Sequence, residues 1–276
     1  MATLALGILS WRAPETLAAT LQTYAAGGLF DLFTEKRVYF QEISDEDRAV
    51  AAHYGLTAEG TDANTGIEGG VRALVGGTRA ELILLLENDC PLVVDPETAK
   101  EALHRAAADM ARHDIPVFRM RSRRHPGENF TRTDKYQSLF AVRGPLDSDI
   151  HIHTPSPLGI LARRSLRPLK ARRFRGDAAY VERDPVSAQP KAIRVSDHGN
   201  FLTDSRFINW SNQSVLVRPD FMHDILFPGV EANPSNRVIA GVQDLERAAN
   251  RRWWRAARVP IGISEPGLFT HSRLDR

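Results

Sequence analysis

The chain has 276 residues, with 36 Lys and Arg against 34 Asp and Glu, a net charge of +2, 42% apolar side chains and a single cysteine. A chain of this length buries roughly three-quarters of the surface it exposes when unfolded, so its core needs neither disulfides nor a structural metal. The lone Cys90 excludes a disulfide scaffold and a cysteine-rich zinc site, and no segment approaches the ~20 apolar residues of a membrane span, so we expect a cytoplasmic protein.

The N-terminal part alternates short apolar runs with helical patterns, which is typical of a βαβ series on a largely parallel sheet. The predicted strands are Leu4–Ser10, Arg37–Glu42, Glu81–Glu87 and Pro116–Met120. The predicted helices cover about 14–27, 45–54, 66–75 and 96–112. Five consecutive aliphatic residues, 82–86, predict that the third of these strands is central and buried on both faces.

Beyond residue 120 the periodicity weakens, and residues 151–204 predict long loops. The next predicted elements are a strand at Val215–Val217 and a short helix at Pro219–Leu226. A further helix is predicted from about Val238 to Trp254.

Several nucleotide-binding and hydrolase motifs are absent from the sequence. There is no G-x-G-x-x-G after the first strand and no G-x-x-x-x-G-K-[ST], so neither a dinucleotide-binding turn nor a P-loop is indicated. H-E-x-x-H and G-x-S-x-G are also missing. These absences disfavour a zincin or a standard α/β-hydrolase.

Acidic side chains follow the most hydrophobic predicted strand, as Glu87-Asn88-Asp89. Ligands of open α/β sheets bind at the carboxyl ends of the strands. Glu87 and Asp89, two apart on an extended chain, would face the same side, where their carboxylates suit Mg²⁺ or Mn²⁺. The alternative is a polar turn that caps a buried strand.

Four segments taken together resemble a known family: Ser10-Trp11-Arg12, Glu42-Ile43-Ser44-Asp45, Asn64-Thr65-Gly66-Ile67 and Leu86-Glu87-Asn88-Asp89. Their order and spacing over residues 4–112 resemble the nucleotide-sugar half of GT-A glycosyltransferases, particularly the family 2-like group. The resemblance implies a GT-A-like α/β fold, with a Rossmann-like half whose mostly parallel sheet is flanked by helices, and an irregular C-terminal acceptor part. We expect residues 1–120 to bind the nucleotide sugar and 121–276 to bind the acceptor, with a basic, loop-rich insertion at about 121–205.

In this family an Asp-x-Asp motif binds the metal and the diphosphate, which implies that role for Asp89. Glu87 stands where the family commonly has aspartate, and its longer side chain reaches a metal through water. A late histidine can complete the metal site, which implies His271, and neutral imidazole is a sound ligand for Mn²⁺. The implied cofactor is Mn²⁺ or Mg²⁺.

The same resemblance implies the residues that contact the nucleotide-diphosphate sugar. Ser10 and Arg12 lie at the mouth of the first strand, and Arg12 could pair with a phosphate. Glu42 closes the second strand and would accept a hydrogen bond from the base or ribose. Asn64 and Gly66 belong to the Asn-x-Gly segment that opens the third helix.

Two carboxylates near the start of the last predicted helix are candidates for the catalytic base. Glu246 is preferred as the acceptor-facing carboxylate and Asp244 is the second choice, because residues two apart on a helix point in different directions. In an inverting reaction one of them would deprotonate the acceptor, and in a retaining reaction they would orient acceptor or sugar. The alternative is that both complement the helix dipole and pair with Arg247 or Arg251.

Three tryptophans are candidates for an acceptor pocket, since sugar faces stack on indole: Trp210, Trp253 and Trp254. Adjacent helical residues point about 100° apart, so core packing is the alternative for at least one of the last two.

Two basic runs lie in the least periodic region. They are Arg119, Arg121, Arg123 and Arg124, followed by Arg163, Arg164, Arg167, Lys170, Arg172, Arg173 and Arg175. Such runs attract phosphates, anionic lipids or nucleic acid. No nucleic-acid-binding motif accompanies them, so we expect peripheral contact with an anionic membrane surface, at its inner face, rather than nucleic acid. The alternative is a solvated face.

The sequence thus predicts a metal-dependent glycosyltransferase that moves a sugar from a nucleotide-diphosphate sugar to a hydroxyl of a glycan or glycolipid. One alternative is a nucleotidyltransferase of similar fold, although Ser10-Trp11-Arg12-Ala13-Pro14 is poor in the glycine that its phosphate loop requires. Another is a non-catalytic protein that binds sugar nucleotides or polyanions through its arginines.

Overall fold

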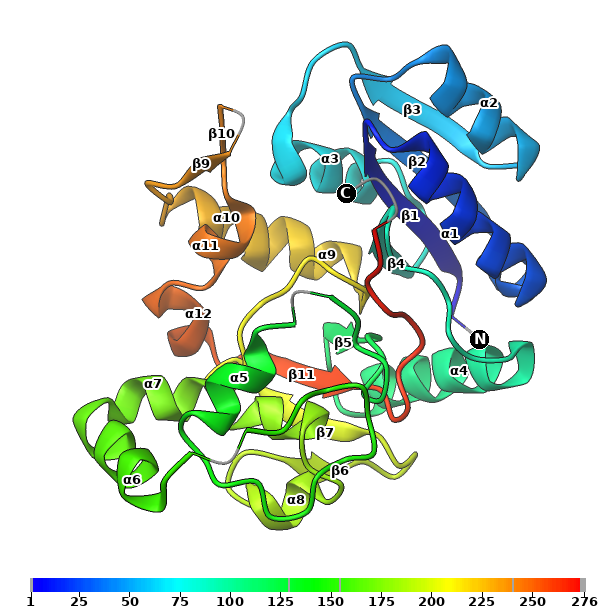
Figure 1. The fold of residues 1–276 in the computed structure, drawn as a ribbon. Coiled ribbons are helices and arrows are strands. Elements are labelled where there is room, and N and C mark those ends of the chain that lie inside the picture. Colours follow the sequence, from blue (N-terminus) through cyan, green and yellow to red (C-terminus); the bar gives the residue numbers. More distant parts are fainter. Residues whose placement is uncertain (1, 129, 154, 240, 274–276) are drawn as a thin grey trace.

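A computed structural model describes residues 2–128, 130–153, 155–239 and 241–273 of the chain (Figure 1). Its strands are β1 (Leu4–Trp11), β2 (Glu35–Gln41), β3 (Thr57–Thr61), β4 (Leu82–Glu87), β5 (Val117–Arg119), β6 (Arg194–Val195), β7 (Phe201–Asp204), β8 (Val215–Val217), β9 (Val238–Ile239), β10 (Val242–Gln243) and β11 (Pro260–Ile263). Its helices are α1 (Pro14–Ala26), η1 (Leu29–Leu32), α2 (Asp45–His53), α3 (Gly66–Gly76), α4 (Pro96–Arg112), α5 (Arg132–Gln137), α6 (Pro157–Leu166), α7 (Pro168–Arg173), η2 (Gly176–Tyr180), α8 (Pro185–Ala188), α9 (Pro219–Phe221), η3 (Met222–Leu226), α10 (Phe227–Glu231), α11 (Leu245–Ala249) and α12 (Arg252–Ala257).

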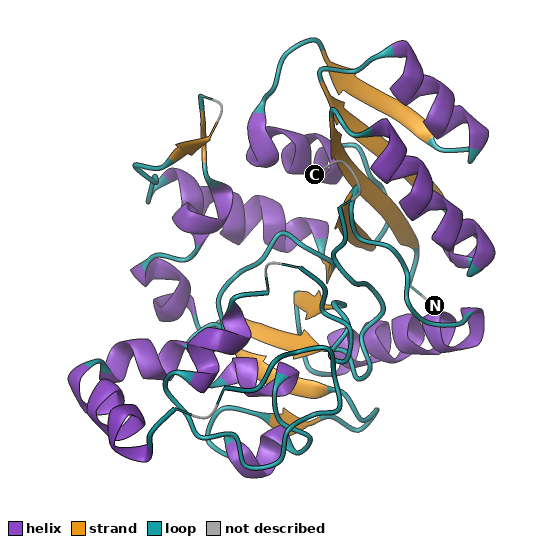
Figure 2. Ribbon diagram, viewed as in Figure 1, coloured by secondary structure: helices purple, strands orange, loops and turns teal. Residues whose placement is uncertain are grey.

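One large sheet, in the order β3-β2-β1-β4-β8-β5-β11-β7-β6, runs through the described residues (Figure 2). The first four strands in this order are mutually parallel, and β8 lies antiparallel between β4 and β5. The predicted central position of β4 is confirmed, because it pairs with β1 on one side and β8 on the other. The carboxyl ends of β1, β2 and β4 therefore meet at one edge, where Leu9 of β1 is in register with Glu87.

The two faces of this sheet are covered by different helices. On β1, Leu6 belongs to a buried cluster with Leu17 of α1 and Leu103 of α4. Leu9 belongs to the other cluster, together with Leu74 of α3. Alternate strand residues thus feed two hydrophobic layers, which is why the central strands read as continuous apolar runs.

Helix boundaries in the first half follow the local signals in the sequence. Ser44 and Asp47 form a capping box, in which the Ser44 side chain accepts from the Asp47 backbone N–H and the Asp47 carboxylate accepts from the Ser44 backbone N–H. The Asp95 side chain caps α4 by accepting from the backbone N–H of Thr98. The four predicted helices and four predicted strands of this half are confirmed, with small shifts of their ends.

The predicted helix from Val238 to Trp254 is wrong. Val238–Ile239 and Val242–Gln243 pair instead as the antiparallel strands β9 and β10, and Gly241 has φ of +83°, which a right-handed helix does not accept. Asp244 then caps the short helix α11 by accepting from the backbone N–H of Arg247, and a separate helix, α12, follows.

The expectation of long loops over 151–204 is wrong for residues 157–173, which form α6 and α7. Each helix begins at a proline, and Ser156 caps α6. Ile160 and Ala171 are the buried side chains of these two helices, whereas Leu158, Leu161, Leu166 and Leu169 are exposed, so most of their apolar residues do not form a face packed on the core. Figure 1 shows both helices projecting from the body of the molecule.

Several further strands and one helix extension were not predicted. The edge strand β3 is polar and half exposed, and β11 spans four residues, so neither has an apolar run of the expected length. The predicted helix at Pro219–Leu226 is confirmed as α9 and η3, and it continues through α10 to Glu231. The predicted division of the chain at residue 120 stays a prediction.

Candidate active site

Three metal-binding side chains meet at the carboxyl end of β4. The ligand atoms of Glu87, Asp89 and His271, here called the triad, all lie within 4.8 Å of one another. His271 Nε2 is 3.2 Å from Asp89 Oδ2, and Asp89 and His271 are buried. The structure therefore brings His271 next to two residues that precede it by 184 and 182 positions, and these three are the metal ligands that the resemblance implied.

Backbone hydrogen bonds hold residues 268–272, here called the C-terminal segment, against the turn after β4. Val93 N donates to Leu268 O at 2.9 Å, Thr270 N to Pro91 O at 3.1 Å, and Ser272 N to Asp89 O at 2.9 Å. Figure 1 shows this red segment passing between the N-terminal strands and the green loops that follow β5. These backbone bonds fix the imidazole of His271 next to Asp89.

A glycine on the opposite side permits this close approach. Gly127 has φ of +75°, and Glu128 N donates to His271 O at 2.9 Å. A Cβ atom on Gly127 would lie 2.2 Å from that carbonyl oxygen. The His271 backbone is therefore enclosed from both sides.

The electrostatics of the triad favour a bound cation. Burial, with the nearby negative charges of Asp89 and Glu246, raises the pKa of Glu87 to about 7. Gln213 Nε2 lies 3.5 Å from Glu87 Oε2, and Arg121 donates to the amide oxygen of Gln213. Two carboxylates and an imidazole match the ligands of Mn²⁺, and carboxylates match those of Mg²⁺, so the residues present fit the expected metal.

A cavity of about 490 Å³, here called the triad cavity, opens beside these ligands. Its walls are the ends of β1, β2 and β4, the start of α3, and the segments that carry β10 and His271. Its volume is typical of small-molecule sites. Among the described residues, three buried polar atoms around it have no hydrogen-bond partner: Ser10 Oγ, Asn88 Nδ2 and His271 Nδ1. Buried polar atoms are normally paired, so these three are free to bind a ligand.

The turn before α3 forms another wall of the triad cavity. Asn64 Oδ1 accepts from Gly66 N at 2.7 Å, and Gly66 has φ of +72°. Gln41, the last residue of β2, donates to Gly66 O at 2.6 Å and accepts from Thr65 N at 2.7 Å. Asn64 and Gly66 thus line the cavity, and Gln41 holds their backbone in place.

Arg12 and Glu42 are not among the residues that line the triad cavity. Glu42 Oε2 accepts from Trp11 Nε1 at 2.8 Å and pairs with Arg12 Nε at 2.5 Å, and these contacts lower the pKa of Glu42. Both residues have left-handed backbone conformations, with φ of 47° and 58°. Glu42 therefore anchors the indole of Trp11, which does line the cavity.

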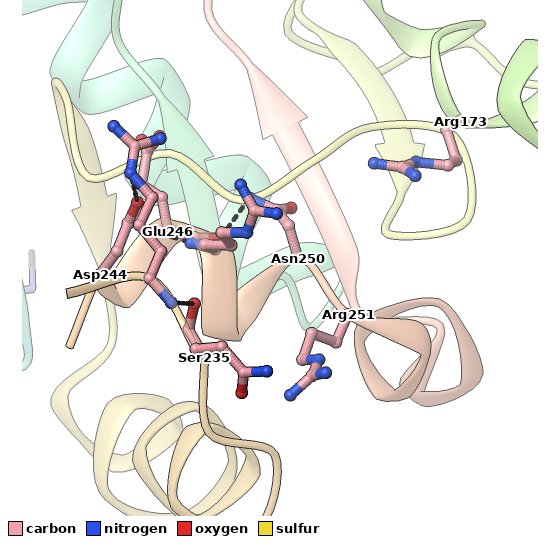
Figure 3. A pocket seen from close by; sticks show the side chains of 9 residues that line it. Arg173, Ser235, Asp244, Glu246, Asn250 and Arg251 are labelled. Carbon is pink, nitrogen blue, oxygen red and sulfur yellow. Dashed lines mark hydrogen bonds and ion pairs between the residues drawn. The ribbon is translucent and has the colours of Figure 1, made fainter.

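The two candidate bases occupy different positions. Asp244 lines both the triad cavity and a second cavity of about 520 Å³ (Figure 3). Glu246 lines the second cavity alone, and its Oε1 accepts from Asn212 N at 3.0 Å. The cavity geometry thus favours Asp244, whereas the sequence had favoured Glu246. The role of either residue stays a prediction.

The tryptophans serve mainly the core. Trp210 and Trp254 are buried, and their rings meet edge to face with centroids 5.9 Å apart. Trp253 is half-buried and lies against Gly229, where a Cβ atom would be 2.5 Å from the indole. No tryptophan of this group lines the cavities described above.

Three of the four arginines in the first basic run are buried, contrary to expectation, and only Arg124 of this run is exposed. Arg119, Arg121 and Arg123 are buried, because β5 and the residues after it lie between β8 and β11 and under the C-terminal segment. Arg121 donates to Gln213, and Arg123 pairs with Glu265 at 2.7 Å. The second run, on α6 and α7, remains largely exposed.

Several residues of the triad cavity were not predicted from the sequence, among them the polar side chains of Gln41, Asn88, Gln213 and Arg273. Arg273 Nε lies 3.6 Å from Asp89 Oδ2, which places a positive charge beside the triad. Its position two residues after His271 in an extended segment was the available signal, because alternate residues share a face.

Comparisons with known proteins support the fold. No protein-family model matches the chain, and no curated protein matches it. A solved structure titled as a mycobacterial protein is similar over 100% of this chain and 68% of its own, at 12% identity and a TM-score of 0.51. The chain therefore shares with this structure the expected α/β fold, in which a mostly parallel central sheet is flanked by helices.

Other solved structures are more distant. S. aureus TarS 1–349 in complex with UDP-GlcNAc matches at 13% identity and a TM-score of 0.48, over 99% of this chain and 59% of its own. The mannosyltransferase PcManGT from Pyrobaculum calidifontis, in complex with GDP-Man and Mn²⁺, matches at 11% identity and a TM-score of 0.38, over 51% of this chain and 41% of its own. The chain thus spans about three-fifths of the TarS fragment and less of the mannosyltransferase.

Proposed function

We propose that the chain is a metal-dependent glycosyltransferase, which transfers a sugar from a nucleotide-diphosphate sugar to a hydroxyl of a glycan or glycolipid. The observation that carries this proposal is the triad in the wall of the triad cavity, at the carboxyl ends of β1 and β4. In open α/β sheets this is the edge where ligands bind. Within a GT-A-like fold, an oxygen-rich metal site there suits a sugar diphosphate.

The residues around the triad would divide the work of donor binding. Asp89, His271 and Glu87 would hold Mn²⁺ or Mg²⁺, which when bound stabilises the charge that develops on the diphosphate. Arg273 would add a positive charge on the same side, 3.6 Å from Asp89. Trp11, held by Glu42, offers an aromatic face to the base or the sugar.

Asp244 is the preferred base of an inverting reaction. It stands where the triad cavity meets the second cavity, so an acceptor hydroxyl could reach it from the side opposite the donor. Asp244 Oδ1 caps α11, while Oδ2 lies 3.5 Å from Arg237 Nε. The base would take the hydroxyl proton as the acceptor oxygen bonds to the sugar carbon and the nucleoside diphosphate leaves.

Metal-dependent turnover of a nucleotide sugar tests the proposal. We expect at least one donor from a panel of UDP-, GDP- and CDP-sugars to release its nucleoside diphosphate in the presence of Mn²⁺, and EDTA to stop the release. The same donor with Mn²⁺ should raise the melting temperature, because it binds the folded state. Release of pyrophosphate from a nucleoside triphosphate and a sugar phosphate would identify a nucleotidyltransferase instead, and neither turnover nor stabilisation with any donor would contradict both activities.

We further propose that the helical pair α6–α7 contacts an anionic membrane surface. Leu158, Leu161, Leu166 and Leu169 are 80%, 60%, 81% and 77% exposed. Residues 157–176 contain no acidic residue among seven Arg and Lys. Exposed leucines between basic side chains are typical of interfacial helices. Within the described part of the chain, no helix is long and apolar enough to cross a membrane.

Vesicle binding tests this contact. Replacing Leu158, Leu166 and Leu169 by serine is expected to weaken binding to vesicles of phosphatidylglycerol and phosphatidylcholine at least tenfold, because each leucine buries apolar area in the interface. Co-sedimentation measures the change. Val195→Ser, which removes an exposed apolar side chain from β6, is the matched control. Equal binding by the triple variant and the control would exclude α6–α7 as the contact.

A further inference from the structure

A third cavity, of about 510 Å³, continues the second one away from the triad. The two share Arg173, Asn250 and Arg251 in their walls, and the second also contains Asp244, which borders the triad cavity. The three spaces thus follow one another from the metal ligands outward. The outer end is lined by Leu169 and Arg172 of α7, and Leu169 is one of the four exposed leucines of the pair α6–α7.

The walls of these two outer cavities carry a large excess of positive charge. Among the described residues, six of their arginines form no ion pair with a carboxylate; they are Arg172, Arg173, Arg247, Arg251, Arg252 and Arg255, and the space they line is here called the arginine groove. Arg206 and Arg237, which also line it, are paired with Asp204 and Asp244. Asp244 and Glu246 are the acidic residues of the groove.

Two of these arginines are held in a position that is unfavourable for a free cation. The Nε atoms of Arg173 and Arg255 are buried and have no hydrogen-bond partner among the described residues. Burial lowers the pKa of Arg173, and burial together with the charge of Arg173 lowers the pKa of Arg255 to about 10. Figure 3 shows Arg173 reaching from a separate segment toward the wall that carries Asn250 and Arg251. A bound anion would relieve the repulsion and supply the missing acceptors.

We infer that the acceptor of the proposed transfer carries phosphate groups, which the arginine groove binds while the acceptor hydroxyl reaches Asp244. The role of the phosphate ligand as the acceptor rests on the proposed function. The binding of phosphate by the groove does not depend on that function. A guanidinium group can donate two parallel hydrogen bonds to the oxygens of one phosphate. The six arginines without an ion pair offer more donors than a ligand with a single carboxylate could accept from. Among the residues that the structure describes, no aromatic side chain lines the groove, so this part of it lacks the stacking surfaces of single-stranded nucleic-acid sites.

Binding of inorganic tripolyphosphate, measured by calorimetry in EDTA, tests the groove without the metal site. The test variant is Arg173→Gln with Arg252→Gln, because neither side chain supports the fold through a hydrogen bond or an ion pair among the described residues. The control is Arg48→Gln with Arg79→Gln, which removes the same charge from exposed positions on and near the N-terminal strands and helices. We expect at least tenfold weaker binding for the test variant and less than twofold for the control.

Two further measurements keep this result separate from the proposed activity. Asp89→Asn removes a metal ligand outside the groove, and it is expected to bind tripolyphosphate as tightly as the unmodified chain. The groove would then stand even if no nucleotide sugar were turned over. Equal weakening in the test and control variants, or no tripolyphosphate binding below 1 mM, would overturn the inference, and so would tighter binding of a short single-stranded oligonucleotide.

The source of the phosphate is distinguished by competition on vesicles. In one outcome, tripolyphosphate releases the unmodified chain from phosphatidylglycerol vesicles, and this release is lost in the variant Arg173→Gln with Arg252→Gln. That outcome would identify a lipid phosphate as the ligand of the groove. Vesicle binding that tripolyphosphate does not affect, together with the tenfold loss in calorimetry, would assign a water-soluble phosphate to the groove and the membrane to α6–α7.

Discussion

Asp89→Asn is expected to lower metal-dependent release of nucleotide by about 10²–10³-fold, the loss that follows removal of one preorganised electrostatic contact. Asp89 is buried, and its Oδ2 atom lies 3.2 Å from His271 Nε2 and 3.6 Å from Arg273 Nε. The substitution keeps the shape of the side chain and the backbone bond from Ser272 N to Asp89 O. It removes the charge that a divalent cation requires. Nucleotide release and the Mn²⁺ dissociation constant both measure the effect.

The matched control is Glu81→Gln, because Glu81 is an exposed carboxylate just before the other end of β4. It should leave both quantities within twofold of the unmodified chain. Unreduced turnover in Asp89→Asn would remove Asp89 from the metal site and, with it, the main support for the proposed mechanism.

The first half of the fold could be predicted because its signals are local. Leu82–Leu86 is apolar throughout since β4 is covered on both faces, and Ser44 and Asp95 mark helix starts by bonding the backbone next to them. The second half has helix caps too, such as Ser156 and Asp244, but its elements are short and few of their side chains are buried. Helix α6 buries Ile160 alone, and β11 is placed by pairing with β5 and β7 rather than by its own four residues.

The candidate site divides in the same way. Glu87 and Asp89 follow a predictable strand, so their place at the sheet edge could be foreseen. Residue His271 needed the family resemblance, because its position depends on backbone bonds to a turn about 180 residues earlier. Arg121 was misplaced on the surface since charge alone does not reveal that a strand continues beneath the C-terminal segment. Gln41 was missed because its contacts are with a backbone turn, which leaves no charge pattern.

Glu87→Gln is expected to change stability in opposite directions with and without metal. Burial and the neighbouring carboxylates raise the pKa of Glu87 from 4.5 to about 7, so the folded state holds this proton more tightly than the unfolded chain does. The stability that the protonated form contributes is complete below pH 4.5, and it is lost as the pH rises toward and through 7. The neutral glutamine removes this loss.

At pH 8 in EDTA, Glu87→Gln should therefore melt at a higher temperature than the unmodified chain, by roughly 2–4 °C for each kcal/mol relieved, and the difference should vanish near pH 4.5. Saturating Mn²⁺ should reverse the order at pH 8, since the ionised Glu87 is then stabilised by the cation and the amide is a weaker ligand. Melting curves at both pH values, with Glu81→Gln as the control, measure this crossing. A higher melting temperature for Glu87→Gln under all four conditions would mean that Glu87 lies beside the metal without binding it. A lower melting temperature for Glu87→Gln in EDTA at pH 8 would mean that the Glu87 carboxylate stabilises the fold without metal. It would contradict the charge repulsion within the triad that the metal is expected to relieve.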